Sequence, residues 1–176
     1  MAKISYGFRF PLHLACDTIH ELLPDLGRVY FEDGYAYATV RLILVKFKIS
    51  DLFEGKGDAA LLDKKTLPVA SFRALYQTRE EPEIKADGIQ LGEVLYKTRE
   101  EAKAPLNFER ALEYVNGAPE AVEKIAFNPE KIHKLGQIMA DGNGLRFEFY
   151  GNRRGAVVKP TSPELHAMAL LMPLAL

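Results

Sequence analysis

The chain has 176 residues and a net charge of −1, from 23 basic and 24 acidic side chains. This length suits one domain with a sizeable core or two small domains, and it excludes a long multidomain assembly. Apolar residues make up 48% of the chain, which is typical of a folded protein. The balanced charge excludes a global field that would attract nucleic acid or an anionic membrane, so such binding would need a local patch.

The cysteine content and the N-terminus narrow the setting. Cys16 is the single cysteine, so the chain has neither an internal disulfide nor a multi-cysteine zinc cage. No apolar run follows the N-terminal lysine, and no stretch reaches the ~18 apolar residues that a membrane span needs. These features predict a reducing, cytoplasmic location and no membrane partner.

The first predicted elements are a helix, a hairpin and a strand. Apolar residues recur at helical spacing over 12–23. Two runs rich in β-branched and aromatic residues then meet at Asp33-Gly34, a pair that tolerates the positive φ of a tight hairpin. Residues 41–49 continue as a strongly apolar strand whose polar face is basic.

The middle of the chain repeats this order. A helix is predicted over 69–77, directly after Pro68, and a hairpin over 83–96 that turns at Asp87-Gly88. Residues 98–121 read as a charged connector, in which ALEYVNG is a candidate strand.

The last part contains the clearest helix. Asn128 is a good N-cap, and Pro129 suits the first helical position. The apolar stripe of this helix consists of Ile132, Leu135, Ile138 and Met139. A hairpin over 145–160 follows, and the sequence runs apolar from 166 to 176.

The chain therefore predicts an α+β fold made of repeated strand-helix-antiparallel-strand units. The three units cover about 3–50, 64–97 and 122–176, with helices and sheet segregated. We expect a division into 1–63 and 64–176.

Two clusters of side chains are candidates for chemistry. His13, Cys16, Asp17 and His20 would share one face of the first helix, which admits either a metal site or an ordinary polar flank around a small buried cysteine. A metal-dependent enzyme built on His13, Cys16 and His20 is a minor alternative. No nucleotide-binding, zinc-protease or nucleophile-elbow motif occurs, so we expect no cofactor and no catalytic residue.

The second cluster is basic and lies in the last unit. It consists of Lys131, Lys134, Arg153 and Arg154 in a region where cations outnumber acids. Such a patch could contact DNA phosphates or form a solvated basic face.

The apolar C-terminal segment has two compatible interpretations. Most chain ends are polar, whereas this one carries no charge after Glu164. It could be a buried last strand, or its end could line an apolar groove for another protein's peptide. Pro173 must end regular strand pairing, which would leave Leu174 to Leu176 beside the surface.

This tail and the elements before it resemble the C-terminal part of the bacterial sliding clamp, the beta subunit of the replicative DNA polymerase. The family ends with an aliphatic strand, Met-Pro, an apolar residue, a variable position and Leu, and Leu170 to Leu176 stand in that place. The order YVNG, EKIAFN, NPEKIHKLGQIM, LRFEFYG and GAVVKP also matches, over about 106–176. Closer to the N-terminus, clamps carry an Asp-Gly-His-Arg-Leu run in one strand, and this sequence has only its last two residues, Arg41-Leu42.

The resemblance implies a curved antiparallel sheet outside and helices inside, closed by homo-oligomerisation into a ring around duplex DNA. It implies 1–63 as a first clamp-like half-domain and 64–176 as a clamp-like domain. It also implies a groove for a DNA polymerase or clamp-loader peptide, lined by Leu42, Leu170, Leu171, Met172, Pro173 and Leu174.

The predicted function is thus a non-enzymatic, phage-like or accessory clamp that tethers or modulates replication proteins. The alternative is a clamp-fold module that does not encircle DNA and regulates clamp partners as a decoy. The chain has about half the usual length of the family. Its first helix carries Asp17 and Glu21 and no Lys or Arg, so it would face DNA poorly.

Overall fold

The computed structural model describes residues 5–16, 24–40, 42–100, 108–113, 115, 117–140, 142–151 and 154–174. The strands are β1 (Gly7–Phe8), β2 (Arg28–Glu32), β3 (Tyr35–Val40), β4 (Ile43–Lys48), β5 (Phe53–Glu54), β6 (Lys65–Pro68), β7 (Glu83–Lys85), β8 (Gly88–Leu91), β9 (Val94–Lys97), β10 (Arg99–Glu100), β11 (Leu145–Phe149), β12 (Ala156–Pro160) and β13 (Ala167–Leu171). The α-helices are α1 (Ile49–Leu52), α2 (Val69–Leu75), α3 (Phe108–Glu113) and α4 (Pro129–Met139), and the 3₁₀ helices are η1 (Leu12–Ala15), η2 (Pro24–Gly27) and η3 (Ala59–Leu62).

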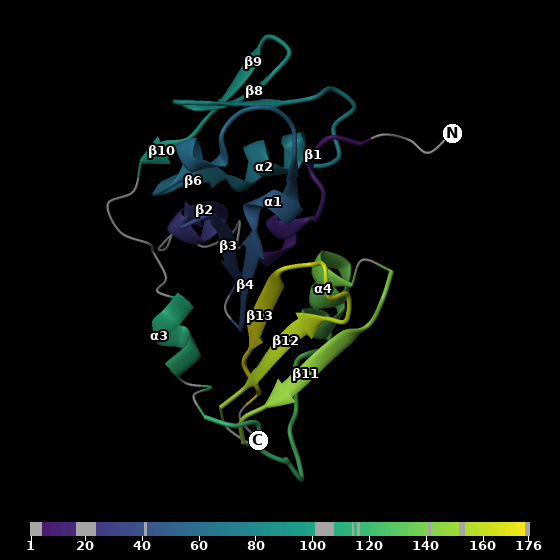
Figure 1. Cartoon of the computed structure of the whole chain (residues 1–176). Coiled ribbons are helices and arrows are strands. Elements are labelled where there is room, and N and C mark those ends of the chain that lie inside the picture. Colours follow the sequence, from purple (N-terminus) through teal and green to yellow (C-terminus); the bar gives the residue numbers. More distant parts are fainter. Residues whose placement is uncertain are drawn as a thin grey trace.

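An eight-stranded antiparallel sheet with the order β10-β6-β2-β3-β4-β13-β12-β11 runs through the molecule (Figure 1). The first unit contributes β2, β3 and β4, and the third contributes β11, β12 and β13. The two units join where β4 pairs with β13, in a register that runs from Phe47 opposite Ala167 to Ile43 opposite Leu171. The predicted α+β class with antiparallel strands is confirmed.

The second unit crosses into this sheet and also builds its own. Its first strand, β6, pairs with β2 of the first unit. The division expected between residues 63 and 64 falls just before β6, so this pairing crosses it. The strands β7, β8 and β9 form a separate three-stranded sheet, and Thr98 alone separates β9 from β10.

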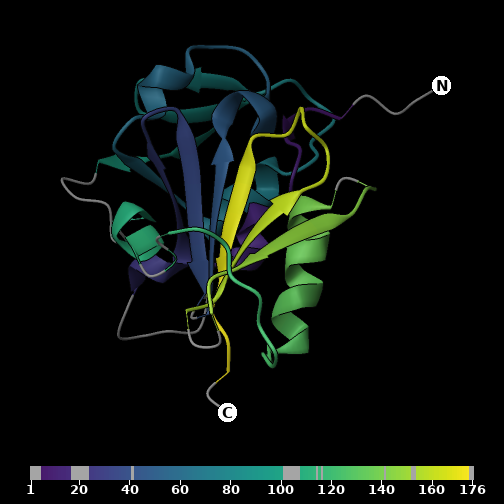
Figure 2. The same cartoon turned by 60° about the horizontal axis from the view of Figure 1, so that its bottom comes forward.

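The large sheet separates the apolar residues into two clusters, one on each face, and helices lie on both faces. We call the first the helix-side core: side chains of η1, α2 and α4, such as Leu12, Phe72 and Leu135, pack with Phe47 and Leu171 of the sheet. We call the second the outer-face cluster. It lies beneath α3, which Figure 2 shows on the opposite side of the sheet from α4.

Local sequence explains the best-predicted elements. Asp33 and Gly34 both have positive φ, 51° and 77°, in the two-residue turn between Glu32 and Tyr35, as a tight hairpin requires. The side chain of Asn128 accepts a hydrogen bond from the backbone N–H of Glu130, which caps α4. The hairpin at 33–34, the helix α2 and the helix α4 are thus confirmed.

Three expectations need correction. The turn after β7 uses Ala86 and Asp87, one residue earlier than expected, because Lys85 pairs with Gly88. A second turn at Gly92 then adds β9, so three strands replace the expected hairpin. The candidate strand at 111–117 is wrong: α3 begins at Phe108, and Ala111 and Leu112 pack on the sheet from a helix.

The predicted first helix is described only in part. The 3₁₀ helix η1 ends at Ala15, and Cys16 is already extended, with φ −104° and ψ 145°. Residues 17–23 lie outside the described residues. Cys16 therefore does not continue the helical face on which the metal hypothesis placed it with His13.

Candidate functional site

The C-terminal strand β13 lies in the middle of the large sheet, between β4 and β12. Its ladder ends at Leu171, but the pairing continues for one step, because the backbone N–H of Met172 donates to the carbonyl of Leu42 at 2.9 Å. After Pro173, the N–H of Leu174 donates to the carbonyl of Ala126 at 2.8 Å. The side chain of Leu174 is exposed. Regular pairing thus stops before the proline, and the following residue lies at the surface.

Neighbouring leucines of β13 point to opposite faces of the sheet. Leu171 is fully buried in the helix-side core. Leu170 belongs to the outer-face cluster and lies opposite Leu44 of β4. Alternation along a strand places Met172 on the face of Leu170. The predicted groove combined both leucines, and the structure separates them: Leu171 packs with the helices instead.

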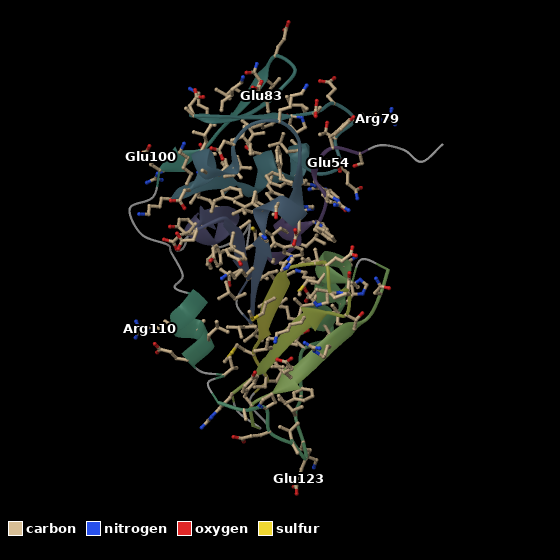
Figure 3. All side chains as sticks on the ribbon, viewed as in Figure 1. Glu54, Arg79, Glu83, Glu100, Arg110 and Glu123 are labelled. Carbon is tan, nitrogen blue, oxygen red and sulfur yellow. The ribbon has the colours of Figure 1, made fainter. Side chains whose placement is uncertain are left out.

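The outer-face cluster is partly covered by the chain's own connector. Among the described residues, its buried members are Leu44, Val115, Tyr150, Val157 and Leu170. Ala111 and Leu112 of α3 pack against them, while Arg110 points away from the sheet (Figure 3). Sequence reasoning missed this helix, although the spacing of Ala111, Leu112 and Val115 was a helical signal.

The loop between β11 and β12 approaches the tail closely because it contains Gly155. Gly155 has φ 95°, and a Cβ there would lie 2.8 Å from the carbonyl oxygen of Leu171 and 3.4 Å from the Sδ of Met172. A side chain at this position would clash with the backbone. The neighbouring residue Arg154 is exposed on this loop. Arg153 lies outside the described residues.

The two predicted DNA-binding lysines lie on α4 and share one carboxylate. The ammonium of Lys134 is 3.1 Å from Glu130, and that of Lys131 is 3.5 Å from the same oxygen. The hydrogen bond from Lys134, together with the charge of Lys131, lowers the pKa of Glu130. Lys131 is 9% exposed, whereas its neighbour Ile132 is 39% exposed, so Lys131 takes the place expected for Ile132, while Leu135, Ile138 and Met139 of the expected stripe are buried. Lys131 is therefore poorly placed to reach a ligand.

Lys134 lines a cavity of about 480 Å³ on the helix side of the sheet. Arg73 of α2 and His13 of η1 line the same cavity, with Leu14, Cys16, Val69 and Ala70. Arg73 is a cation that sequence reasoning did not select. The structure therefore gathers basic groups from three helical segments, although no single segment is strongly basic.

The proposed metal ligands do not form a metal centre in the described part of the chain. No group of three or more His, Cys, Asp or Glu side chains that could hold a metal occurs there. Burial raises the pKa of Cys16 to about 12, and its thiol donates to the carbonyl of Arg28 at 3.7 Å. Burial, followed by the charge of Arg73, lowers the pKa of His13. Asp17 and His20 lie outside the described residues.

No protein-family model and no curated protein matches the sequence. Among the described residues, no helix is long and apolar enough to cross a membrane.

Solved structures match over most of the chain. The DNA polymerase III beta subunit from Pseudomonas aeruginosa matches 93% of this chain and 62% of its own, with a TM-score of 0.60 and 13% identity. The DNA polymerase III beta subunit from Thermotoga maritima matches 100% of this chain and 68% of its own, with a TM-score of 0.58 and 12% identity. The DNA polymerase sliding clamp from Bacillus subtilis matches 99% of this chain and 65% of its own, with a TM-score of 0.56 and 11% identity.

These likenesses concern the arrangement of strands and helices, since sequence identity is low throughout. The chain spans 62% to 68% of the length of these three clamps. It therefore has the fold of the bacterial DNA polymerase III beta subunit, the sliding clamp.

Proposed function

We propose that this chain is a non-enzymatic, sliding-clamp-like protein that tethers or modulates replication proteins through an apolar site at the end of β13. The observation that carries the proposal is the exposed Leu174, in a fold whose solved members are polymerase clamps. It lies three residues beyond the end of β13, whose last three residues are buried. Met172 and Pro173 are half-buried, so together with Leu174 they form a contiguous apolar stretch at the surface, and contiguous exposed apolar surface marks docking sites.

The proposed site lies on the outer face. Its floor is Leu170, its edge is formed by Leu42 and Met172, and Pro173 and Leu174 extend it beyond the sheet. The helix α3 would form one wall, because Leu112 packs on the same cluster. A short polymerase or clamp-loader peptide that carries glutamine and leucine would fit this site: the leucine would be buried on the apolar floor, and the glutamine would bond to backbone groups at its edge.

Deletion of Leu174 to Leu176 tests the site. Burial of one leucine contributes about 1.5 to 3 kcal/mol, so we expect the affinity for a glutamine- and leucine-bearing peptide to fall at least tenfold. The melting temperature should change little, because Leu174 is exposed and contributes one backbone hydrogen bond. Calorimetric titration and a melting curve measure both quantities.

The matched control is Leu61→Ala, since Leu61 is 39% exposed and Leu174 is 40% exposed. Leu61 lies on η3, in a different segment. The control should bind the peptide with unchanged affinity. Unchanged binding by the truncated protein, or loss of its fold, would contradict the proposed site.

The finer proposal is a homo-oligomeric ring around duplex DNA, with the helix side facing the phosphates. Its support is the basic cavity that contains Lys134 and Arg73. Lys134→Glu and Arg73→Glu should each weaken retention on circular duplex DNA and reduce the slope of affinity against salt by about one. An unchanged salt slope in both variants would remove these residues from the DNA surface.

A non-encircling module that occupies clamp partners is the second candidate. The observation that favours it is the pairing of both α4 lysines with Glu130, which leaves them less available to phosphates. Light scattering with and without circular DNA separates the two candidates. A closed ring requires a defined oligomer that stays on circular DNA, whereas a module of this kind binds the peptide without such retention.

A further inference from the structure

The last strands of the three units are β4, β9 and β13, and two of them already pair with each other. β4 of the first unit and β13 of the third run antiparallel over five residue pairs. β9 of the second unit pairs with β8 alone in the described part of the chain. It lies at the top of the molecule, at the free edge of the three-stranded sheet (Figure 1).

The apolar row of this small sheet stops abruptly at that edge. Ile89 of β8 is fully buried and lies opposite Tyr96 of β9, which packs on the helix-side core. Val94 lies on the same face of β9 as Tyr96, two residues away, yet it is 54% exposed. It is the most exposed of the large apolar side chains among the described residues. A further strand at this edge would cover it.

We propose that β9 pairs antiparallel with β9 of a second copy of this chain, about a twofold axis through Leu95. This register places Val94 opposite Tyr96 of the second copy, so the apolar row continues across the interface. The pairing repeats, between two molecules, the contact that β4 and β13 make within one. A twofold interface of this kind uses the same strand from both partners.

Two charged residues fit the same register: Glu93 lies in the turn just before β9, and Lys97 is the last residue of the strand. Glu93 would face Lys97 of the second copy, and symmetry produces this pair twice. Both side chains are exposed, and neither has an ion-pair partner among the residues that the structure describes. Opposite charges directly across antiparallel strands stabilise their pairing. An edge strand also presents a row of unpaired backbone N–H and C=O groups, which makes it a template for the addition of another strand.

The other long edge strand, β11, is less suited to this role. The backbone N–H of Glu120 already donates to the carbonyl of Phe149 at 2.8 Å, at the end of that strand. Its charged residues are engaged within the chain: Glu148 lies 3.2 Å from Arg146 and 2.8 Å from Lys159. The charges of β9 are available for a second copy.

Charge exchange tests the proposal. Strands of four residues bury little area, so the dimer should depend on concentration, and sedimentation equilibrium can measure its dissociation constant. Glu93→Lys and Lys97→Glu each create two like-charge pairs, and each should raise this constant roughly tenfold. The double variant restores opposite charges and should return the constant to that of the parent. A chain that stays monomeric at about 1 mM, or singles and double that dimerise equally, would overturn the proposal.

A disulfide test fixes the register. In Leu95→Cys the two cysteines would lie directly opposite each other at the axis, where a disulfide can close. The native Cys16 can remain, because it is buried. Mild oxidation should link Leu95→Cys into a dimer, whereas Leu61→Cys, exposed on η3, should stay monomeric. Equal cross-linking of both variants would overturn the assigned edge.

This inference does not depend on the peptide site. Peptide affinity, measured on the charge-reversed variants, should equal that of the parent, because β9 lies in a different sheet from β13. Loss of dimer with intact peptide binding supports both proposals. Failure of peptide binding in the parent would remove the proposed function and leave the dimer test valid.

Discussion

Leu170 and Leu171 are adjacent in sequence, yet they belong to the two different apolar regions of the molecule. Leu171 lies in the helix-side core, which η1, α2 and α4 cover and which extends into all three units. Leu170 lies in the outer-face cluster, which has five buried members among the described residues and lies beneath the short helix α3. The first region holds the units together. The second is shallow and borders the tail, which makes it the region suited to binding.

Leu171→Ala should have the largest effect on stability. The side chain is fully buried between the sheet and the helices, so the cavity that the substitution leaves cannot collapse easily. We expect the free energy of unfolding to fall by about 2 to 5 kcal/mol. Urea denaturation measures this change. A loss below about 1 kcal/mol would show that the helix-side core fills the cavity as readily as the outer-face cluster is expected to.

Leu170→Ala should cost less, at about 2 kcal/mol, because α3 can settle onto the shortened side chain. The double variant with Leu112→Ala sharpens the comparison. If Leu112 packs on Leu170 through the outer-face cluster, the two losses should be non-additive by about 0.5 kcal/mol or more. Additive losses would mean that α3 is held independently of β13.

The sequence predicted the apolar tail but could not assign its faces. Alternation of polar and apolar residues marks a face only where one side is exposed to water, and Ala169, Leu170 and Leu171 are all buried. The helical spacing of α4 had a related limit. Lys131 and Ile132 occupy adjacent positions, and the long Lys stem can lie along apolar surface where an isoleucine was expected.

Predictions that rested on local chemistry fared better than those that needed distant partners. The hairpin at Asp33-Gly34 and the cap at Asn128 depend on a few neighbouring residues. The strand hypothesis at 111–117 failed because a short apolar run fits either a helix or a strand, and its contact with Leu44 and Leu170 decides. Arg73 joined Lys134 at one cavity through tertiary packing that no sequence spacing reveals.

The smallest expected effect concerns the start of β13. The backbone N–H of His166 donates to Asp51, and its ring Nδ1 lies 2.9 Å from the same oxygen. Burial would raise the pKa of Asp51, but hydrogen bonds from His166 and Ser50 outweigh it and lower the pKa. Asp51→Asn should therefore cost up to about 1 kcal/mol at neutral pH.

The pH dependence of this variant follows from the sign of the shift. A lowered pKa stabilises the fold above the unfolded value of about 3.9, and the stabilisation disappears as the pH falls through the lower folded value. The melting curves of the parent and Asp51→Asn should converge as the solution is acidified below about pH 4. A difference that stays constant with pH would assign the effect to packing.

The pairing of β4 with β13 also determines the order in which the sheet can be completed. During synthesis the N-terminal strands emerge first, but the partner of β4 is more than a hundred residues further along the chain. Until that segment arrives, the apolar strand Ile43–Lys48 has an open edge that can pair with other chains. The nascent protein would therefore be vulnerable to aggregation late in translation, and closure of this long loop would be a slow step of its folding.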